Sequence, residues 1–152
     1  MRGRRLCRTT RPLRPRNTQE VNALFADTHY FLALLHKGDA AHLKAAALAE
    51  KITNPIITTE WVLTEVGDAL AAVKFRPRFV QLVDALRADP ACTIVPASAA
   101  LFDAGVQLYS ERADKDWTLT DCISFALMHE YALTEALTGD HHFRQAGFRI
   151  LL

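Results

Sequence analysis

The chain has 152 residues, half of them apolar, with a formal net charge of +1 and three cysteines. This length suits one domain with a substantial core, and its apolar runs fall short of the roughly eighteen residues that a membrane-spanning helix needs. An odd number of scattered cysteines argues against a disulfide framework or a zinc site and fits a reducing cytoplasm.

Charge is unevenly distributed along the chain. Seven arginines and no acid fall within residues 1–16, whereas the remainder carries eleven Lys and Arg against seventeen Asp and Glu. The first segment also contains Pro12 and Pro15 and little apolar sequence, a composition typical of disorder. We therefore expect a basic, disordered extension over residues 1–20 and one acidic domain over residues 21–152. A transit peptide or a nucleic-acid-binding arm is an alternative interpretation of the extension.

The first half of the domain alternates short apolar runs with helical patterns. An apolar run ends at Asp27, directly before a helical pattern that begins near Tyr30. Thr59 follows a β-branched run and is suited to cap the helix after it. The predicted elements here are a strand over 21–26, helices over 30–35 and 40–51, a strand over 56–58, and helices over 59–73 and 75–88.

The second half continues the alternation. It predicts a strand over 93–96, a helix from Ser98 to Arg112, a helix over 116–128, and strands over 135–138 and 148–152. Strands separated by helices imply right-handed crossovers, and hence a mainly parallel sheet of about five strands in a three-layer α/β/α sandwich. Ligands bind beyond the carboxyl ends of such strands, where Asp27 and Asp140 are expected.

The helix over 116–128 is apolar on most sides, yet Asp121 lies in its first turn. A buried ionised carboxylate is unfavourable unless it caps the helix, forms a salt bridge, becomes protonated or binds a metal ion. Thr118 and Asp121 have the spacing of a capping box, and capping is the simplest interpretation of Asp121 alone.

Helical periodicity separates the acids of the helix over 59–73. Glu65 lies roughly 90° from the centre of the apolar stripe, whereas Glu60 and Asp68 lie on the outer face. Asp27, Asp121 and Asp140 belong to one edge of the expected sheet, which Glu65 is able to reach. Four neighbouring carboxylates raise one another's pKa unless a cation neutralises them, and a hard ion such as Mg²⁺ suits such oxygen ligands.

Four segments carry a resemblance to a known family. They are Leu24–Thr28, Leu63–Val66, Asp116–Cys122 and Leu137–Phe143, which contain Asp27, Glu65, Asp121 and Asp140. Together they resemble the four acidic motifs of the PIN-domain family, and are most similar to the VapC-type toxins of type II toxin–antitoxin systems. The resemblance covers about residues 22–152 in the order and spacing of that family.

The resemblance implies an endoribonuclease that depends on Mg²⁺ or Mn²⁺ and hydrolyses RNA phosphodiester bonds with a metal-activated water. It implies that Asp27, Glu65, Asp121 and Asp140 are the catalytic metal ligands, with Asp116 as a possible fifth acid. Further implications are a homodimer, an inhibitory cognate antitoxin and a cytoplasmic location. Thr28 and Thr138 are expected to orient ligands or water from outside the metal shell.

Other features carry weaker predictions. Lys74, Arg76 and Arg78 form a basic cluster that is either a solvated helix face or a contact for RNA phosphates. His141 and His142 are interpreted as loop residues, because sequence neighbours seldom ligate one ion together.

Three other functions compete with a toxin nuclease. A phosphatase with an Asp nucleophile lacks its Asp-x-Asp pair here, because residue 29 is His. A PIN-type RNA-processing nuclease that is not a toxin stays open. A non-catalytic PIN-like interaction module would be expected to have lost at least one acid, whereas all four are present.

Overall fold

The computed structural model describes residues 22–152, so the extension predicted over residues 1–20 lies outside the described part. In chain order the elements are β1 (Leu24–Ala26), α1 (Thr28–Leu35), α2 (His42–Lys51), β2 (Ile56–Thr59), α3 (Glu60–Ala69), α4 (Arg76–Ala88), β3 (Cys92–Val95), α5 (Ala99–Glu111), α6 (Leu119–Glu130), β4 (Glu135–Leu137), α7 (His141–Gln145) and β5 (Arg149–Ile150). Among these described helices, none is long and apolar enough to cross a membrane.

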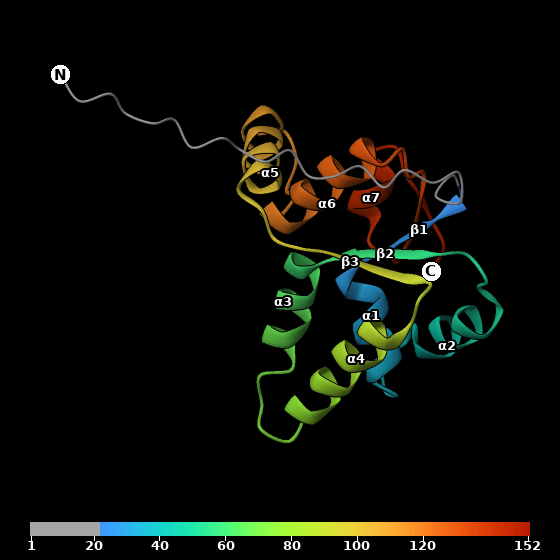
Figure 1. The fold of residues 1–152 in the computed structure, drawn as a ribbon. Coiled ribbons are helices and arrows are strands. Elements are labelled where there is room, and N and C mark those ends of the chain that lie inside the picture. The colour runs from blue at the N-terminus through green and yellow to red at the C-terminus, as the bar shows by residue number, and fades with distance from the viewer. Residues whose placement is uncertain (1–21) are drawn as a thin grey trace.

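The five strands form one sheet in the order β3-β2-β1-β4-β5, and every neighbouring pair is parallel. Helices α1 to α4 lie on one side of the sheet and α5 to α7 on the other (Figure 1). The predicted three-layer sandwich with a parallel sheet of five strands is therefore confirmed. Because β1 lies between β2 and β4 and all three strands run parallel, their carboxyl ends lie side by side. The segments that follow these strands are therefore close together.

Side-chain caps begin three of the long helices, as the sequence predicts. The Thr59 hydroxyl accepts a hydrogen bond from the Val62 amide at 3.1 Å, and the Ser98 hydroxyl accepts one from the Leu101 amide at 3.2 Å. Thr118 caps α6 in the same way. Each such cap contributes about 1 kcal/mol and fixes where its helix leaves the strand or loop before it.

Helix α3 ends at Ala69 and is shorter than the predicted helix over 59–73. Residues 71–74 are all exposed. A further turn there would bury no apolar surface, and helices of this length depend on tertiary packing for their stability.

Stacked and edge-to-face aromatic rings fasten the helices near the acids to the sheet. The Phe143 ring of α7 lies 6.0 Å from that of Phe25 in β1 and 4.9 Å from that of Phe125 in α6, between ring centroids. Trp117, just before α6, meets Phe125 edge-on at 4.9 Å. Such pairs add about 0.5–1.5 kcal/mol to the burial of their area, so α6 and α7 are held rigidly on β1.

A glycine allows α5 and α6 to cross closely. A Cβ atom at Gly105 would lie 3.1 Å from the Cα of Ile123 and nearer still to its Cγ1. Only a residue without a side chain fits at this crossing. This contact fixes how α6, which carries Asp121 in its first turn, packs against α5.

Candidate active site

Asp27 and Thr138 leave the sheet side by side. The register pairs Ala26 of β1 with Leu137 of β4, so the residues that follow are neighbours at the carboxyl edge. The Thr138 hydroxyl donates a hydrogen bond of 2.8 Å to Oδ2 of Asp27 and accepts one of 3.0 Å from the Asp140 amide. One threonine thus connects the acid after β1 to the acid after β4.

Asp121 lies at the start of α6 and is buried. Its Oδ2 accepts a hydrogen bond from the Thr118 amide at 2.8 Å, and its own amide donates to the Thr118 hydroxyl at 3.0 Å. This reciprocal pair is a capping box, as the spacing predicts. The cap uses one lone pair of Oδ2, so both oxygens of this carboxylate are still able to accept another partner.

Glu65 reaches the same region from the second turn of α3. Its Oε2 accepts a hydrogen bond of 2.6 Å from the hydroxyl of Thr28, the residue after Asp27. Glu60 and Asp68 are exposed, and Glu60 instead accepts a hydrogen bond from the Ala97 amide. Periodicity therefore identifies the α3 acid that is hydrogen-bonded to the residue next to Asp27.

The environment of Asp27 and Asp121 disfavours their ionised forms. Burial raises the pKa of Asp27 from 3.8 to about 7, against the hydrogen bond from Thr138, and the charge of Asp121 adds to the rise. Burial also raises the pKa of Asp121, with the charge of Asp140 as a further cause. In the part of the chain that the structure describes, no lysine or arginine forms an ion pair with any of the four acids.

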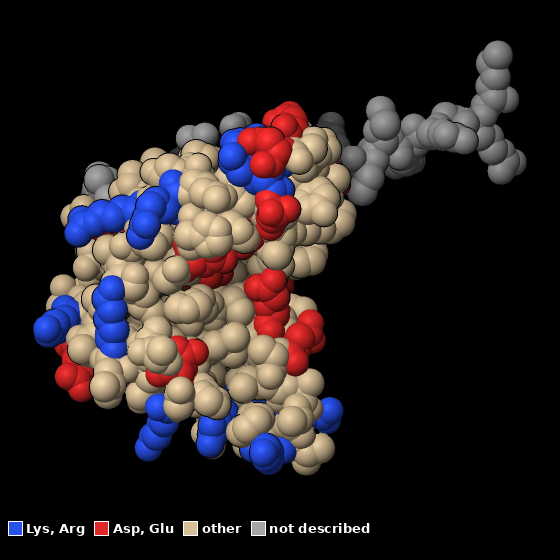
Figure 2. All heavy atoms as spheres, turned by 180° about the vertical axis from the view of Figure 1, so that it is seen from behind, with Lys and Arg blue, Asp and Glu red and all other residues tan. Residues whose placement is uncertain are grey.

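This donor set fits a hard divalent cation. The four acids offer oxygen ligands from the residue after β1, from α3 and α6, and from the N-cap of α7, and among the described residues no lysine or arginine pairs with the buried Asp27. A bound cation would lower the raised pKa values and remove the repulsion between neighbouring carboxylates. Figure 2 shows acidic side chains gathered in and around a hollow, with basic side chains on the outer parts of the same face.

The remaining candidates are Asp116 and the basic cluster of Lys74, Arg76 and Arg78, and all of them are exposed. Asp116 is exposed in the segment between α5 and α6. Lys74 and Arg78 lie over the Phe75 ring, at 4.8 and 5.2 Å from its centroid, and Arg78 donates a hydrogen bond to the Leu35 carbonyl. Because Leu35 ends α1, an eight-residue helix, this basic cluster lies roughly 12 Å from the helix end that follows Asp27.

The interpretation of His141 and His142 as loop residues is wrong, because both lie in the first turn of α7, a short helix capped by Asp140. Nδ1 of His142 lies 3.2 Å from Oδ2 of Asp121 and 3.5 Å from Oδ1 of Asp140. His142 therefore contacts two of the four acids. The sequence signal for this short helix is a capping residue, Asp140, at its start and Gly147 just after its end. Gly147 has a φ of +94°, a conformation that favours glycine and commonly ends a helix.

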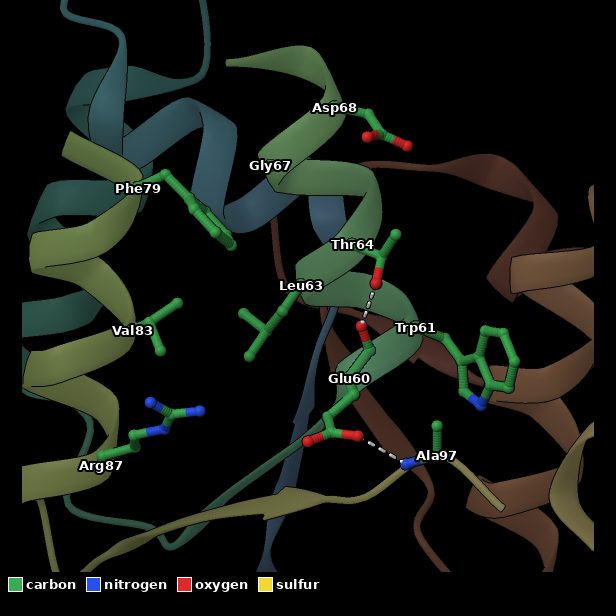
Figure 3. Close-up of a pocket in the computed structure, with 10 residues that line it drawn as sticks. All are labelled: Glu60, Trp61, Leu63, Thr64, Gly67, Asp68, Phe79, Val83, Arg87 and Ala97. Carbon is green, nitrogen blue, oxygen red and sulfur yellow. Dashed lines mark hydrogen bonds between the residues drawn. The ribbon is translucent and has the colours of Figure 1, made fainter. Parts of the chain in front are cut away.

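A pocket of about 490 Å³ lies elsewhere, between α3 and α4. Figure 3 shows Leu63 of α3 facing Phe79 and Val83 of α4, with Arg87 directed toward Glu60 at one end. None of the four acids lines this pocket. It is therefore separate from the candidate active site.

Comparison with known proteins gives one family match and several relatives. A family model described as PIN domain matches residues 24–149. The 23S rRNA-specific endonuclease VapC20 of Mycobacterium tuberculosis is 26% identical over 125 residues, which cover 82% of this chain and 95% of that protein. Its crystal structure, described as that of a sarcin–ricin loop cleaving toxin, superposes with a TM-score of 0.74 at 25% identity, over 82% of this chain and 95% of that one.

Two more distant structures share the fold. FitAcB from Neisseria gonorrhoeae has a TM-score of 0.63 at 15% identity, over 85% of this chain and 96% of that one. VapBC2 from Rickettsia felis, bound to a DNA fragment from its promoter, has a TM-score of 0.59 at 14% identity, over 84% and 96%. At these identities the likeness establishes the architecture alone.

Proposed function

Because the chain belongs to the PIN-domain family, whose model spans residues 24–149, we propose that it is a metal-dependent endoribonuclease and the toxin of a toxin–antitoxin pair. One observation carries this proposal. Buried Asp27 and Asp121 converge with Asp140 at the carboxyl edge of the sheet, and Glu65 is tied to the same place through Thr28. Such a concentration of acids, with no lysine or arginine paired to them among the described residues, suits phosphodiester hydrolysis with a divalent ion.

Asp27, Glu65, Asp121 and Asp140 are proposed to hold Mg²⁺ or Mn²⁺. When bound, the ion supplies Lewis-acid polarisation of the scissile phosphate and lowers the pKa of water. Thr138 orients the Asp27 carboxylate through its 2.8 Å hydrogen bond, and Thr28 does the same for Glu65 at 2.6 Å. Held in this way from outside the metal shell, the ligands lose little freedom when the ion binds.

Large-subunit ribosomal RNA is the substrate that we propose to test first. VapC20, the relative at 26% identity, is named for cleavage of 23S rRNA. Exposed Lys74, Arg76 and Arg78 are candidates for phosphate contacts. Their place at the far end of α1 means that they would engage RNA well away from the cleaved bond.

The proposed partners are a cognate antitoxin and a second copy of the chain. The proposed location of the protein is the cytoplasm. A second copy is supported by an apolar stripe along α5, formed by exposed Phe102, Val106 and Tyr109. Their spacing places these side chains on one helix face, and large exposed apolar residues in a row are typical of interfaces. Val106→Arg is expected to convert a dimer to a monomer in light scattering, without loss of helical circular dichroism.

The proposed activity is tested by incubating the purified chain with a synthetic RNA that folds as the sarcin–ricin loop. Cleavage is expected with Mg²⁺ or Mn²⁺, is expected to stop with EDTA, and is expected to be lost in Asp27→Asn. The matched control is Glu60→Gln, which removes an exposed acid from α3 and should keep activity within about twofold of wild type, as is usual for surface substitutions.

The outcomes separate the competing functions. Undiminished cleavage by folded Asp27→Asn would refute the mechanism. Failure to cleave this loop or any total cellular RNA would favour a non-catalytic module. Cleavage of other RNAs, together with no growth arrest on expression, would favour an RNA-processing nuclease over a toxin.

A further inference from the structure

The His142 ring lies among the acids of the proposed site. Its Nδ1 is 3.2 Å from Oδ2 of Asp121 and 3.5 Å from Oδ1 of Asp140. Two ligand atoms at right angles about an ion, each with a bond of about 2.1 Å, lie roughly 3.0 Å apart. Nδ1 is within hydrogen-bond distance of Asp121 Oδ2, and it is also spaced from both carboxylate oxygens much as neighbouring ligands of one ion would be.

We propose that His142 is a nitrogen ligand of the ion held by Asp121 and Asp140, and that it makes the site prefer a transition-metal ion such as Mn²⁺ over Mg²⁺. The inference rests on the proposed function, which places a divalent ion at these acids. It adds a fifth ligand of a different chemical kind and a direction of metal selectivity.

The ring is held in place by its own helix. The His142 amide donates a hydrogen bond of 2.8 Å to Oδ1 of Asp140, and the next residue, Phe143, is fully buried against Phe25 and Phe125. Only 19% of the His142 side chain is exposed. The ring therefore faces the acids already, and a ligand positioned in advance loses little conformational freedom on binding an ion.

A nitrogen donor changes which ion the site selects. Mg²⁺ favours oxygen ligands and gives up its waters reluctantly, whereas imidazole nitrogen binds first-row transition ions. As a ligand, His142 would be neutral, with its lone pair on Nδ1 and its proton on Nε2. Four acids alone give no such preference, because carboxylates suit Mg²⁺ and Mn²⁺ alike.

The neighbouring His141 provides a natural comparison. One ligand atom from each of Asp140, His141 and His142 falls within a span of 4.8 Å. However, 68% of the His141 side chain is exposed, and its Nδ1 approaches Asp140 alone, at 3.6 Å. The two rings are adjacent, with centroids 4.4 Å apart, so a substitution at either disturbs the same short helix.

The test uses Mn²⁺ and the full, untagged chain after removal of metal with a chelator. Bound Mn²⁺ is examined by electron spin-echo envelope modulation, which detects a directly coordinated ¹⁴N nucleus. Wild type is expected to show this modulation, His142→Asn to lose it and His141→Asn to keep it. In His142→Asn, Mn²⁺ affinity should fall about tenfold or more while Mg²⁺ affinity, measured by competition, changes by less than about threefold.

Each other outcome counts against the inference. Mn²⁺ that binds to wild type without ¹⁴N modulation, or modulation that survives in His142→Asn, would overturn it and leave the proposed acid site intact. Binding that Asp121→Asn leaves unchanged would place the ion elsewhere, and would overturn both this inference and the proposed metal site.

Discussion

The buried carboxylate of Asp27 makes the metal-free protein less stable as pH rises. Its pKa is 3.8 in the unfolded chain and about 7 in the folded one, chiefly through burial. Above pH 3.8 the unfolded chain releases a proton that the folded chain retains, so the free energy of unfolding falls until pH passes 7. At about 1.4 kcal/mol per pKa unit, this difference is worth about 4 kcal/mol at pH 8.

Asp27→Asn removes this titration and keeps an oxygen that accepts the Thr138 hydrogen bond. Urea unfolding in EDTA at pH 5 and pH 8 should show that wild type loses about 2.5 kcal/mol more than the variant between the two pH values. Asp68→Asn, which replaces an exposed acid of α3, should match wild type. The comparison between proteins cancels the titration of groups that do not interact with Asp27.

Added Mn²⁺ should stabilise wild type more than Asp27→Asn at pH 8. Wild type is expected to gain stability with ion concentration, by about 2.7 kcal/mol at one hundred times the dissociation constant, and the variant to gain much less. Equal loss of stability by wild type and Asp27→Asn between pH 5 and pH 8 would refute the view that burial of this acid is costly. Equal gains with Mn²⁺ would refute its role as a ligand.

Two further substitutions test the supports of the site. Thr138→Val removes the hydroxyl that bridges Asp27 and the Asp140 amide. It should lower the free energy of unfolding by about 1–3 kcal/mol in denaturant, because it leaves buried polar groups unpaired. It should also weaken Mn²⁺ binding, and unchanged binding would contradict the bridging role. Gly105→Ala should destabilise by about 1–3 kcal/mol because its methyl meets the α6 backbone. The control Gly67→Ala meets only the end of a phenylalanine ring, so equal losses in the two alanine variants would contradict close packing at the α5 and α6 crossing.

Several features of the site follow from the sequence by simple rules. Asp27 comes directly after β1 and Asp140 follows the last residue of β4 by three positions, which predicts their meeting at one edge of a parallel sheet. Asp121 has the spacing of a capping box with Thr118, and the structure has that box. Glu65 is the α3 acid nearest the apolar stripe. These signals are local, and short-range periodicity and capping chemistry are sufficient to detect them.

Other features depend on tertiary contacts that the sequence pattern does not contain. The 2.6 Å hydrogen bond from Thr28 to Glu65 joins residues 37 apart in sequence, through the packing of α1 on α3. Helix α7 is five residues long, too short for a periodic pattern, and its stability comes from burial of Phe143. The position of His142 against Asp121 follows from that burial, and no local sequence pattern predicts it.

The central claim is that the four acids hold a divalent ion at the carboxyl edge of the sheet. The most direct measurement is anomalous X-ray diffraction from a crystal of the chain grown with Mn²⁺. A peak is expected within about 2.0–2.4 Å of carboxylate oxygens of Asp27, Asp121 and Asp140, with Glu65 close by. A peak only at exposed acids such as Asp68 or Asp116, or no peak at millimolar Mn²⁺, would contradict the claim.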